Sequence, residues 1–234
     1  MSKAITVILI SLFLFGCANN TTVRHASDWQ DHRKNIKSIV IIPDDIKVVE
    51  ITFGGDGDNL PEKEDIITNF VNEELSGLLQ AKGFDAKIID PTILENPDMA
   101  FAIEELDNSY TSIAEETYQA AFMTKEKASK MEHSLGELVA PIGALTEADA
   151  ILLVDFDGAE KSSGMIAKDV AVSVITTLLT GSTPVANTER LTGHFALIDA
   201  KDGDLLWSNI NTSPAINPQM VSKSLLSGLD FKAE

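Results

Sequence analysis

The 234-residue sequence predicts an α/β fold: a mixed sheet of about five strands covered by helices, with a C-terminal β-hairpin and a final helix. Three observations support this class. Residues 36–89 follow the order strand, helix, strand. Residues 150–156 form an almost continuous apolar run, which is typical of a strand covered on both faces. Two later apolar runs flank a polar turn at 199–204, which is the pattern of a hairpin.

The first part of the domain begins with a short strand rich in isoleucine and valine at 36–43, and extended character continues over 46–53. Pro61 and the acidic residues Glu62 and Glu64 suit the first turn of a helix, where the helix dipole favours negative charge. Apolar residues then recur at helical spacing until a stop at Lys82-Gly83. A strand follows at 84–89, and a parallel pairing with the first strand is the simplest arrangement.

The second part reads as helix over 98–146 in two or three pieces, followed by the central strand at 150–156. The apolar stretch 166–185 stays open, because helical spacing and frequent β-branched residues favour a helix and a strand respectively. The hairpin pairs 191–198 with 205–210. Asn217 as N-cap and Pro218 at the first helical position begin a last helix that ends near residue 229.

The N-terminus has the architecture of a secretory signal peptide. Lys3 supplies a positive charge, residues 4–15 are apolar, and Gly16 precedes Cys17, the single cysteine of the chain. The apolar run is shorter than the roughly 20 residues that a membrane-spanning helix needs. We therefore expect a signal peptide at 1–16 and a mature protein without disulfides.

The motif Leu14-Phe15-Gly16-Cys17 resembles the lipobox of bacterial lipoproteins, with a bulky residue at Phe15 where smaller ones are usual. The resemblance implies that Cys17 is lipidated, becomes the first mature residue and anchors the protein in a membrane. Two or three acyl chains exceed the marginal binding that a single chain gives. Ala18 after the cysteine, in place of an aspartate, implies a periplasm-facing position on the outer membrane.

The charge distribution bears on the partners. The chain carries 36 acidic and 18 basic side chains, for a formal net charge of −18, which disfavours nucleic-acid binding. Residues 17–35 are polar and without sustained periodicity, so we expect a lipidated, flexible tether before a single periplasmic domain at 36–234. Basic residues near the anchor, Arg24, Arg33, Lys34 and Lys37, would meet anionic headgroups or simply be solvated.

Catalytic and ligand-binding signatures are few. His25, His32, His133 and His194 show no pairing at metal-ligand spacing, and the usual hydrolase and nucleotide-binding motifs are absent from the sequence. We therefore expect no metal and no cofactor. Asp155 and Asp157 share one face of a strand end and are candidate acid–base carboxylates, although a solvated strand terminus is the simpler interpretation. The acidic stretch 56–59 starts like a calcium loop but fails at Leu60 and Pro61, so a turn is expected.

Three short segments, 148–154, 197–199 and 203–207, carry a second resemblance. It is to periplasmic α/β domains of envelope lipoproteins: the meningococcal vaccine-candidate lipoprotein family, the curli secretion lipoprotein and TolB amino-terminal-like domains. This resemblance implies a non-enzymatic binding or assembly module that contacts envelope proteins or further copies of itself. The alternatives are a subunit of an oligomeric outer-membrane secretion pore and a carboxylate-based envelope hydrolase.

Overall fold

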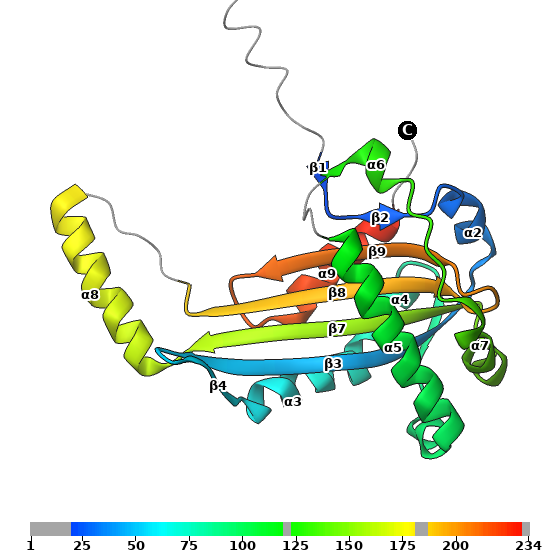
Figure 1. Cartoon of the computed structure of the whole chain (residues 1–234), viewed down its shortest axis with the longest axis horizontal. Helices are drawn as coiled ribbons and strands as arrows, with labels where there is room; N and C mark the ends of the chain where they lie inside the picture. The colour runs from blue at the N-terminus through cyan, green and yellow to red at the C-terminus, as the bar shows by residue number, and fades with distance from the viewer. Residues whose placement is uncertain (1–19, 119–122, 181–186, 231–234) are drawn as a thin grey trace, which may run out of the picture.

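The computed structural model describes residues 20–118, 123–180 and 187–230, and its centre is a seven-stranded mixed sheet with helices on both faces (Figure 1). The α/β class is confirmed, with seven strands where about five were expected. The predicted signal peptide at 1–16 and Cys17 lie outside the described residues.

The strand order is β2-β9-β8-β7-β3-β4, and β5 also pairs with β3. Strands β3, β5 and β7 are mutually parallel and the other pairings are antiparallel. The parallel pairing predicted for the first two strands is confirmed, as is the hairpin of β8 and β9. The bounds are β2 Arg24–His25, β3 Ser38–Thr52, β4 Gly55–Asn59, β5 Asp85–Ile88, β7 Ala150–Lys161, β8 Glu189–Asp199 and β9 Leu205–Ser213.

Strand β3 is longer than the sequence suggested, because it continues through the proline at which a stop was expected. Its pairing with β7 shifts register between Pro43 and Ile46, so a bulge accommodates the missing N–H of the proline. The acidic stretch expected as a turn is strand β4, which pairs back onto the end of β3.

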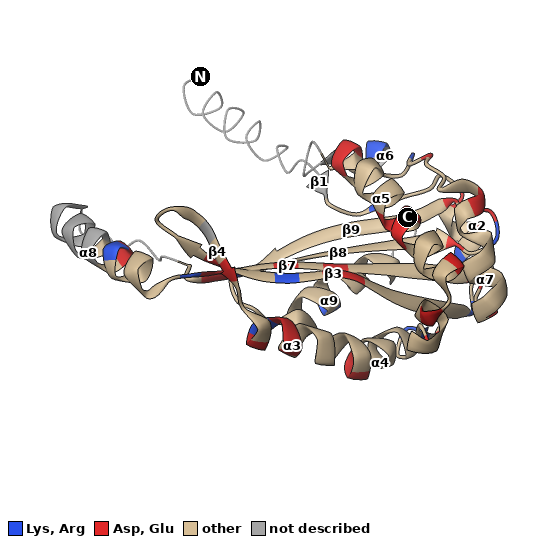
Figure 2. Cartoon of the chain, turned by 60° about the horizontal axis from the view of Figure 1, so that its bottom comes forward, with Lys and Arg blue, Asp and Glu red and all other residues tan. Residues whose placement is uncertain are grey.

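One face of the sheet is covered by a helix predicted from its apolar spacing. It runs as α3 (Pro61–Phe70), a π-helical turn (Val71–Leu75) and α4 (Ser76–Gln80). Helix α9 (Pro218–Ser227) packs beside it, capped as predicted by the Asn217 side chain, which accepts a hydrogen bond from the Met220 N–H at 2.9 Å. Figure 2 shows α3, α4 and α9 together on this side, with α5 on the opposite side.

The other face is covered by α5 (Pro97–Thr117) and α7 (Ala140–Thr146). The prediction of helix throughout 98–146 was wrong in the middle. There the described residues form β6 (Met123–Thr124), the single turn α6 (Lys125–Ala128) and an extended passage with bridges from Met131 to Ala26 and from Ser134 to Asp204. Met131 and Leu135 are both buried although no α-helix joins them, so their spacing of four residues misleadingly indicated one.

Residues 20–35 belong to the folded domain, which corrects the prediction of a tether that reaches residue 35. Strand β1 (Asn20–Thr21) pairs with β6, β2 pairs with β9, and α2 (Trp29–Asn35) follows. Trp29 and Arg24 are each 1% exposed. These two buried side chains and the short strand pairings dock a polar segment, and hydrophobic periodicity does not reveal isolated anchors of this kind.

The sequence left open whether 166–185 forms a helix or a strand. The described part of this stretch is helical and belongs to α8 (Ser163–Thr180). It leaves the ends of β3 and β7 and projects away from the rest of the domain (Figure 1). Residues 181–186 lie outside the described part. In the described ranges, no helix has both the length and the apolar character that crossing a membrane requires.

Candidate functional site

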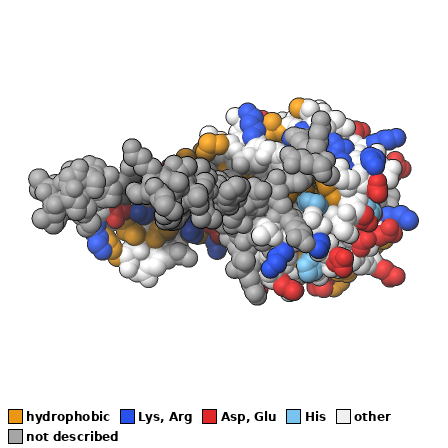
Figure 3. Space-filling view, turned by 90° about the horizontal axis from the view of Figure 1, so that it is seen from above, with side chains coloured by type: hydrophobic (Ala, Val, Ile, Leu, Met, Phe, Trp, Pro, Cys, Tyr) orange, Lys and Arg blue, Asp and Glu red, His pale blue; other side chains and the backbone are white. Residues whose placement is uncertain are grey.

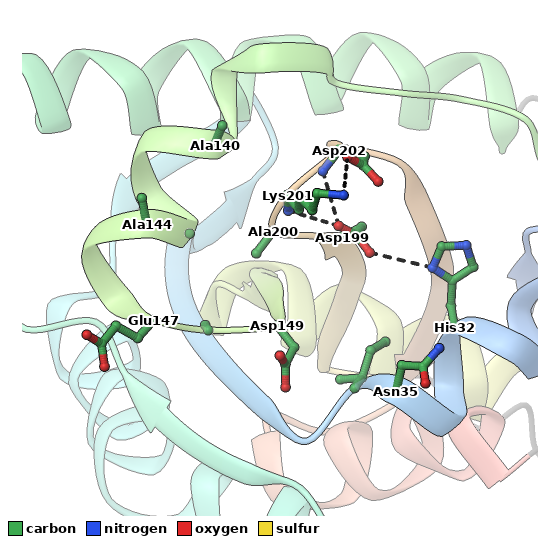
Figure 4. A pocket seen from close by; sticks show the side chains of 13 residues that line it. His32, Asn35, Ala140, Ala144, Glu147, Asp149, Asp199, Ala200, Lys201 and Asp202 are labelled. Carbon is green, nitrogen blue, oxygen red and sulfur yellow. Dashed lines mark hydrogen bonds and ion pairs between the residues drawn. The ribbon is translucent and has the colours of Figure 1, made fainter.

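A pocket of about 660 Å³ lies at the end of the sheet where β3 and β7 begin, between α2, α7 and the β8–β9 turn (Figure 4). Pockets that take small ligands or single side chains fall within about 300–1,000 Å³. Three elements that are distant in sequence therefore meet around a space of suitable size.

Small residues form one wall of the pocket. Ala140, Gly143 and Ala144 of α7 face Ala200 of the turn. A side chain at Gly143 would overlap the carbonyl oxygen of Ala200, so only glycine allows α7 to approach the turn this closely. Helix α7 then ends at Glu147, which adopts a left-handed conformation with φ of 53°.

Acidic side chains form the rim. Asp199 accepts hydrogen bonds from the backbone N–H groups of Lys201 (2.8 Å) and Asp202 (3.1 Å). Its second oxygen lies 3.5 Å from Nδ1 of His32, whose Nε2 lies 3.2 Å from Asp28. Carboxylates therefore flank both nitrogens of the imidazole, and the ring joins α2 to the β8–β9 turn.

Asp149 lies on the opposite side of the pocket and also fixes the start of β3. It accepts hydrogen bonds of 2.9 Å from the backbone N–H groups of Lys37 and Ser38 and from the Ser38 hydroxyl. Desolvation opposes its charge, but these hydrogen bonds outweigh that effect and lower the pKa of Asp149. Asp149 is therefore a fixed negative charge at neutral pH.

A second polar group lies beneath α5. The hydroxyl of Tyr110 is hydrogen-bonded to Nε2 of His194 (2.8 Å) and to the Ser208 hydroxyl (2.9 Å), and Tyr118 also reaches Ser208 at 2.9 Å. Burial lowers the pKa of His194 to about 4 and raises the pKa of Tyr118 to about 12. These four side chains are neutral at pH 7, and the buried Arg24 guanidinium lies 4.9 Å from the centre of the Tyr118 ring beside them.

Asp155 lies next to this network, directly opposite His194 in the β7–β8 pairing. A carboxyl group from β3, Asp44, is hydrogen-bonded to Asp107 of α5. Burial, and then the hydrogen bond and charge of Asp107, raise the pKa of Asp44 to about 9. Burial raises the pKa of Asp155 to about 6 against the hydrogen bond that it accepts from Asp45. Asp44 is therefore protonated at neutral pH.

The structure separates the predicted acid–base pair. The difference is one of burial: Asp155 is half-buried near Asp44 and Asp107, whereas Asp157 is exposed on the same strand, where its charge still acts on Asp155. The sequence did not predict the contact between Asp44 and Asp107, because it depends on the β3 bulge and on the packing of α5 against the sheet. His194 packs against a helix, because it contacts α5 through Tyr110.

The other predicted residues have mixed outcomes. His25 and His32 lie in folded elements and not in a tether, and His32 lines the pocket. Among the described residues, no group of three or more His, Cys, Asp and Glu side chains is arranged to hold a metal ion. Cys17 is outside the described range.

No family model and no curated protein matches the chain. Among solved structures, it is similar to a PelC dodecamer from Paraburkholderia phytofirmans, with 13% identity, a TM-score of 0.34, and coverage of 92% of this chain and 99% of that one. It is also similar to the LpoB C-terminal domain from Salmonella enterica, with 12% identity, a TM-score of 0.25, and coverage of 80% and 98%. Likeness at these TM-scores carries no argument about what the chain does.

Proposed function

We propose that the protein is a lipoprotein of the cell envelope, anchored through Cys17 to the outer membrane and facing the periplasm, where it acts as a non-enzymatic binding or assembly module. The single observation that carries this proposal is the placement of Cys17 after Gly16 and the apolar run at 4–15. Two or three acyl chains at this residue would hold the protein on the membrane.

The N-terminal part of the fold supports an anchored role. It begins close to Cys17, so the domain is expected to lie nearer to the membrane than a long tether would place it. Only Ala18 and Asn19 separate Cys17 from β1, so the chain between them spans about 10 Å at full extension. The domain would therefore sit next to the bilayer, held by the pairings of β1 and β2, and not stand off on a long tether.

Of the four basic residues after the anchor, three contact other residues of the domain, and Lys37 is exposed. Arg24 is buried, and the Arg33 guanidinium lies 4.0 Å from the centre of the Phe84 ring and donates to the Lys82 carbonyl. Lys34 pairs with Asp31 at 2.8 Å. These contacts favour the acyl chains over headgroup attraction as the source of membrane binding.

The surface offers two places for protein contact. One is the projecting helix α8, where Val170 is 57% exposed and the neighbouring Phe53 of the β3–β4 turn is 64% exposed. The other is the pocket between α2 and α7. Accessible features of this kind suit a module that works through partners, which include further copies of the chain.

The test is intact mass and membrane fractionation of the natively expressed protein beside two variants. Cys17→Ser should abolish the lipid mass increment and release the protein from membranes. Ala18→Asp is the matched control, because it should keep the lipid mass and move the protein to the inner membrane. A wild-type protein that is unmodified and freely soluble would overturn the proposal.

A further inference from the structure

We propose that the pocket between α2 and α7 binds an organic cation, an ammonium or guanidinium group presented by a basic peptide segment of a protein partner. The inference deepens the proposed function, on which it rests for the presence of such a partner in the envelope. The pocket combines a ligand-sized volume, a wall of small residues and an acidic rim.

The charges of the rim define the ligand class. Four carboxylates line the pocket, those of Glu147, Asp149, Asp199 and Asp202, and among its described lining residues Lys201 is the single Lys or Arg. Lys201 is largely exposed, with its ammonium 3.6 Å from Asp202, so it points to the rim and leaves the interior negative. The four carboxylates outnumber the single ammonium of the lining, so the pocket attracts a cation and repels an anion.

The wall of small residues favours a cation that is carried on an apolar stem. Ala140, Ala144 and Ala200 offer methyl groups and little polar surface. Lysine and arginine side chains have the same division, an aliphatic stem with a charged head. The stem would lie along α7 while the head reaches Asp199 and Asp149.

A neighbouring pocket favours an extended segment over a single amine. This second pocket, of about 320 Å³, is lined by Asp28, Glu132 and Asp204 among others. Asp28 lines it and also contacts His32, which lines the first pocket, so the two spaces lie on either side of this pair. Figure 3 shows acidic and histidine side chains on this half of the molecule, at the end opposite α8, interspersed with Lys and Arg side chains. A peptide with two separated cations could occupy both.

The test is calorimetric titration of the full-length protein in detergent micelles with a capped pentapeptide that contains two arginines. The same peptide with glutamine at both positions, and spermidine, are titrated in parallel. We expect the arginine peptide to bind, with affinity that falls as salt is raised, and the glutamine peptide not to bind. Equal binding of the arginine and glutamine peptides, or no binding of any cation, would overturn the inference. Binding of spermidine without binding of the arginine peptide would show that the pocket binds cations but that a peptide does not supply them.

Variants assign the binding to this pocket. The double substitution Glu147→Gln with Asp202→Asn removes two exposed rim charges and should weaken binding by about five- to tenfold. The matched control, Glu104→Gln with Glu116→Gln, removes two exposed charges from α5 and should leave the affinity unchanged. Ala144→Phe should block the pocket without changing the thermal unfolding of the protein. Equal affinities in the rim and control variants would reject the site, whatever the outcome of the lipidation experiment, since the titration does not depend on Cys17.

Discussion

Replacing Asp44 by asparagine should stabilise the protein at alkaline pH and remove part of its pH dependence. In the folded protein the pKa of this carboxyl is about 9, raised by burial and by Asp107, whereas in the unfolded chain it should be near its ordinary value of 3.8. Between these values the folded state holds a proton that the unfolded state has lost. Stability therefore falls as the pH rises through this window.

The magnitude follows from one proton. Each pH unit in the window lowers the free energy of unfolding by at most about 1.4 kcal/mol, which gives about 2 kcal/mol between pH 7 and pH 8.5. Asp44 is half-buried, so solvent screening reduces the expected loss to about 1 kcal/mol. Asparagine keeps a hydrogen-bond donor toward Asp107 and takes up no proton, so this loss should disappear in the variant.

The window also separates Asp44 from its titratable neighbours. Asp155, with a pKa of about 6, and His194, with a pKa of about 4, complete most of their titration below pH 7. Urea unfolding at pH 7, 7.5, 8 and 8.5 measures the slope for the wild type, for Asp44→Asn and for Asp157→Asn. The last removes an exposed carboxylate from the same cluster and should follow the wild type. Identical slopes for wild type and Asp44→Asn would refute the assignment of the proton to this carboxyl.

Three further substitutions test the packing by urea unfolding at pH 7. Trp29→Ala should lower the free energy of unfolding by about 3–5 kcal/mol because the indole is buried. A change below about 0.5 kcal/mol would show that the segment around Trp29 is a flexible tether and is not docked on the domain. Tyr110→Phe should lower it by about 1–3 kcal/mol, because His194 and Ser208 lose a buried partner, and no change would show that the hydroxyl is dispensable. Gly193→Ala should lower it by about 1–3 kcal/mol, because a methyl group would press on Val221 of α9, and a more stable variant would contradict this contact.

Hydrophobic pattern alone was enough to locate the elements that bury apolar residues continuously. The strand that became β7 is buried over its first five residues, and the hairpin of β8 and β9 is marked by a polar turn between two apolar arms. The helix that begins at Pro61 follows from its acidic first turn and apolar spacing. In each of these the local sequence and the final packing favour the same structure.

The same pattern failed where a segment is docked by one or two side chains. The passage around Met131 and the segment around Trp29 are polar in composition, and they are held by isolated buried side chains, short two-residue strand pairings and single backbone bridges. Such docking depends on surfaces that form only when β9 is in place. The local sequence of the docked segment therefore does not predict those surfaces.

The polar sites were less predictable than the fold, since their members come together from distant positions. Spacing along one strand selected Asp155 with Asp157, but it could not show that Asp44 from β3 and Asp107 from α5 also lie beside Asp155. The pocket likewise takes its walls from α2, α7 and the β8–β9 turn. A search for pairs that are close in sequence cannot find either arrangement.

The position of the proposed anchor relates these features to one another. β2 follows Cys17 closely and pairs with β9 at one edge of the large sheet, whose strands run between the acidic pocket at one end and α8 at the other (Figure 1). Anchoring at this edge would direct the strands along the membrane, so both ends would be open to neighbours that diffuse in the same plane. The acidic end would then recruit a basic segment while the α8 end contacts a different surface. The two contacts would be separable by mutation, because they share no described residue.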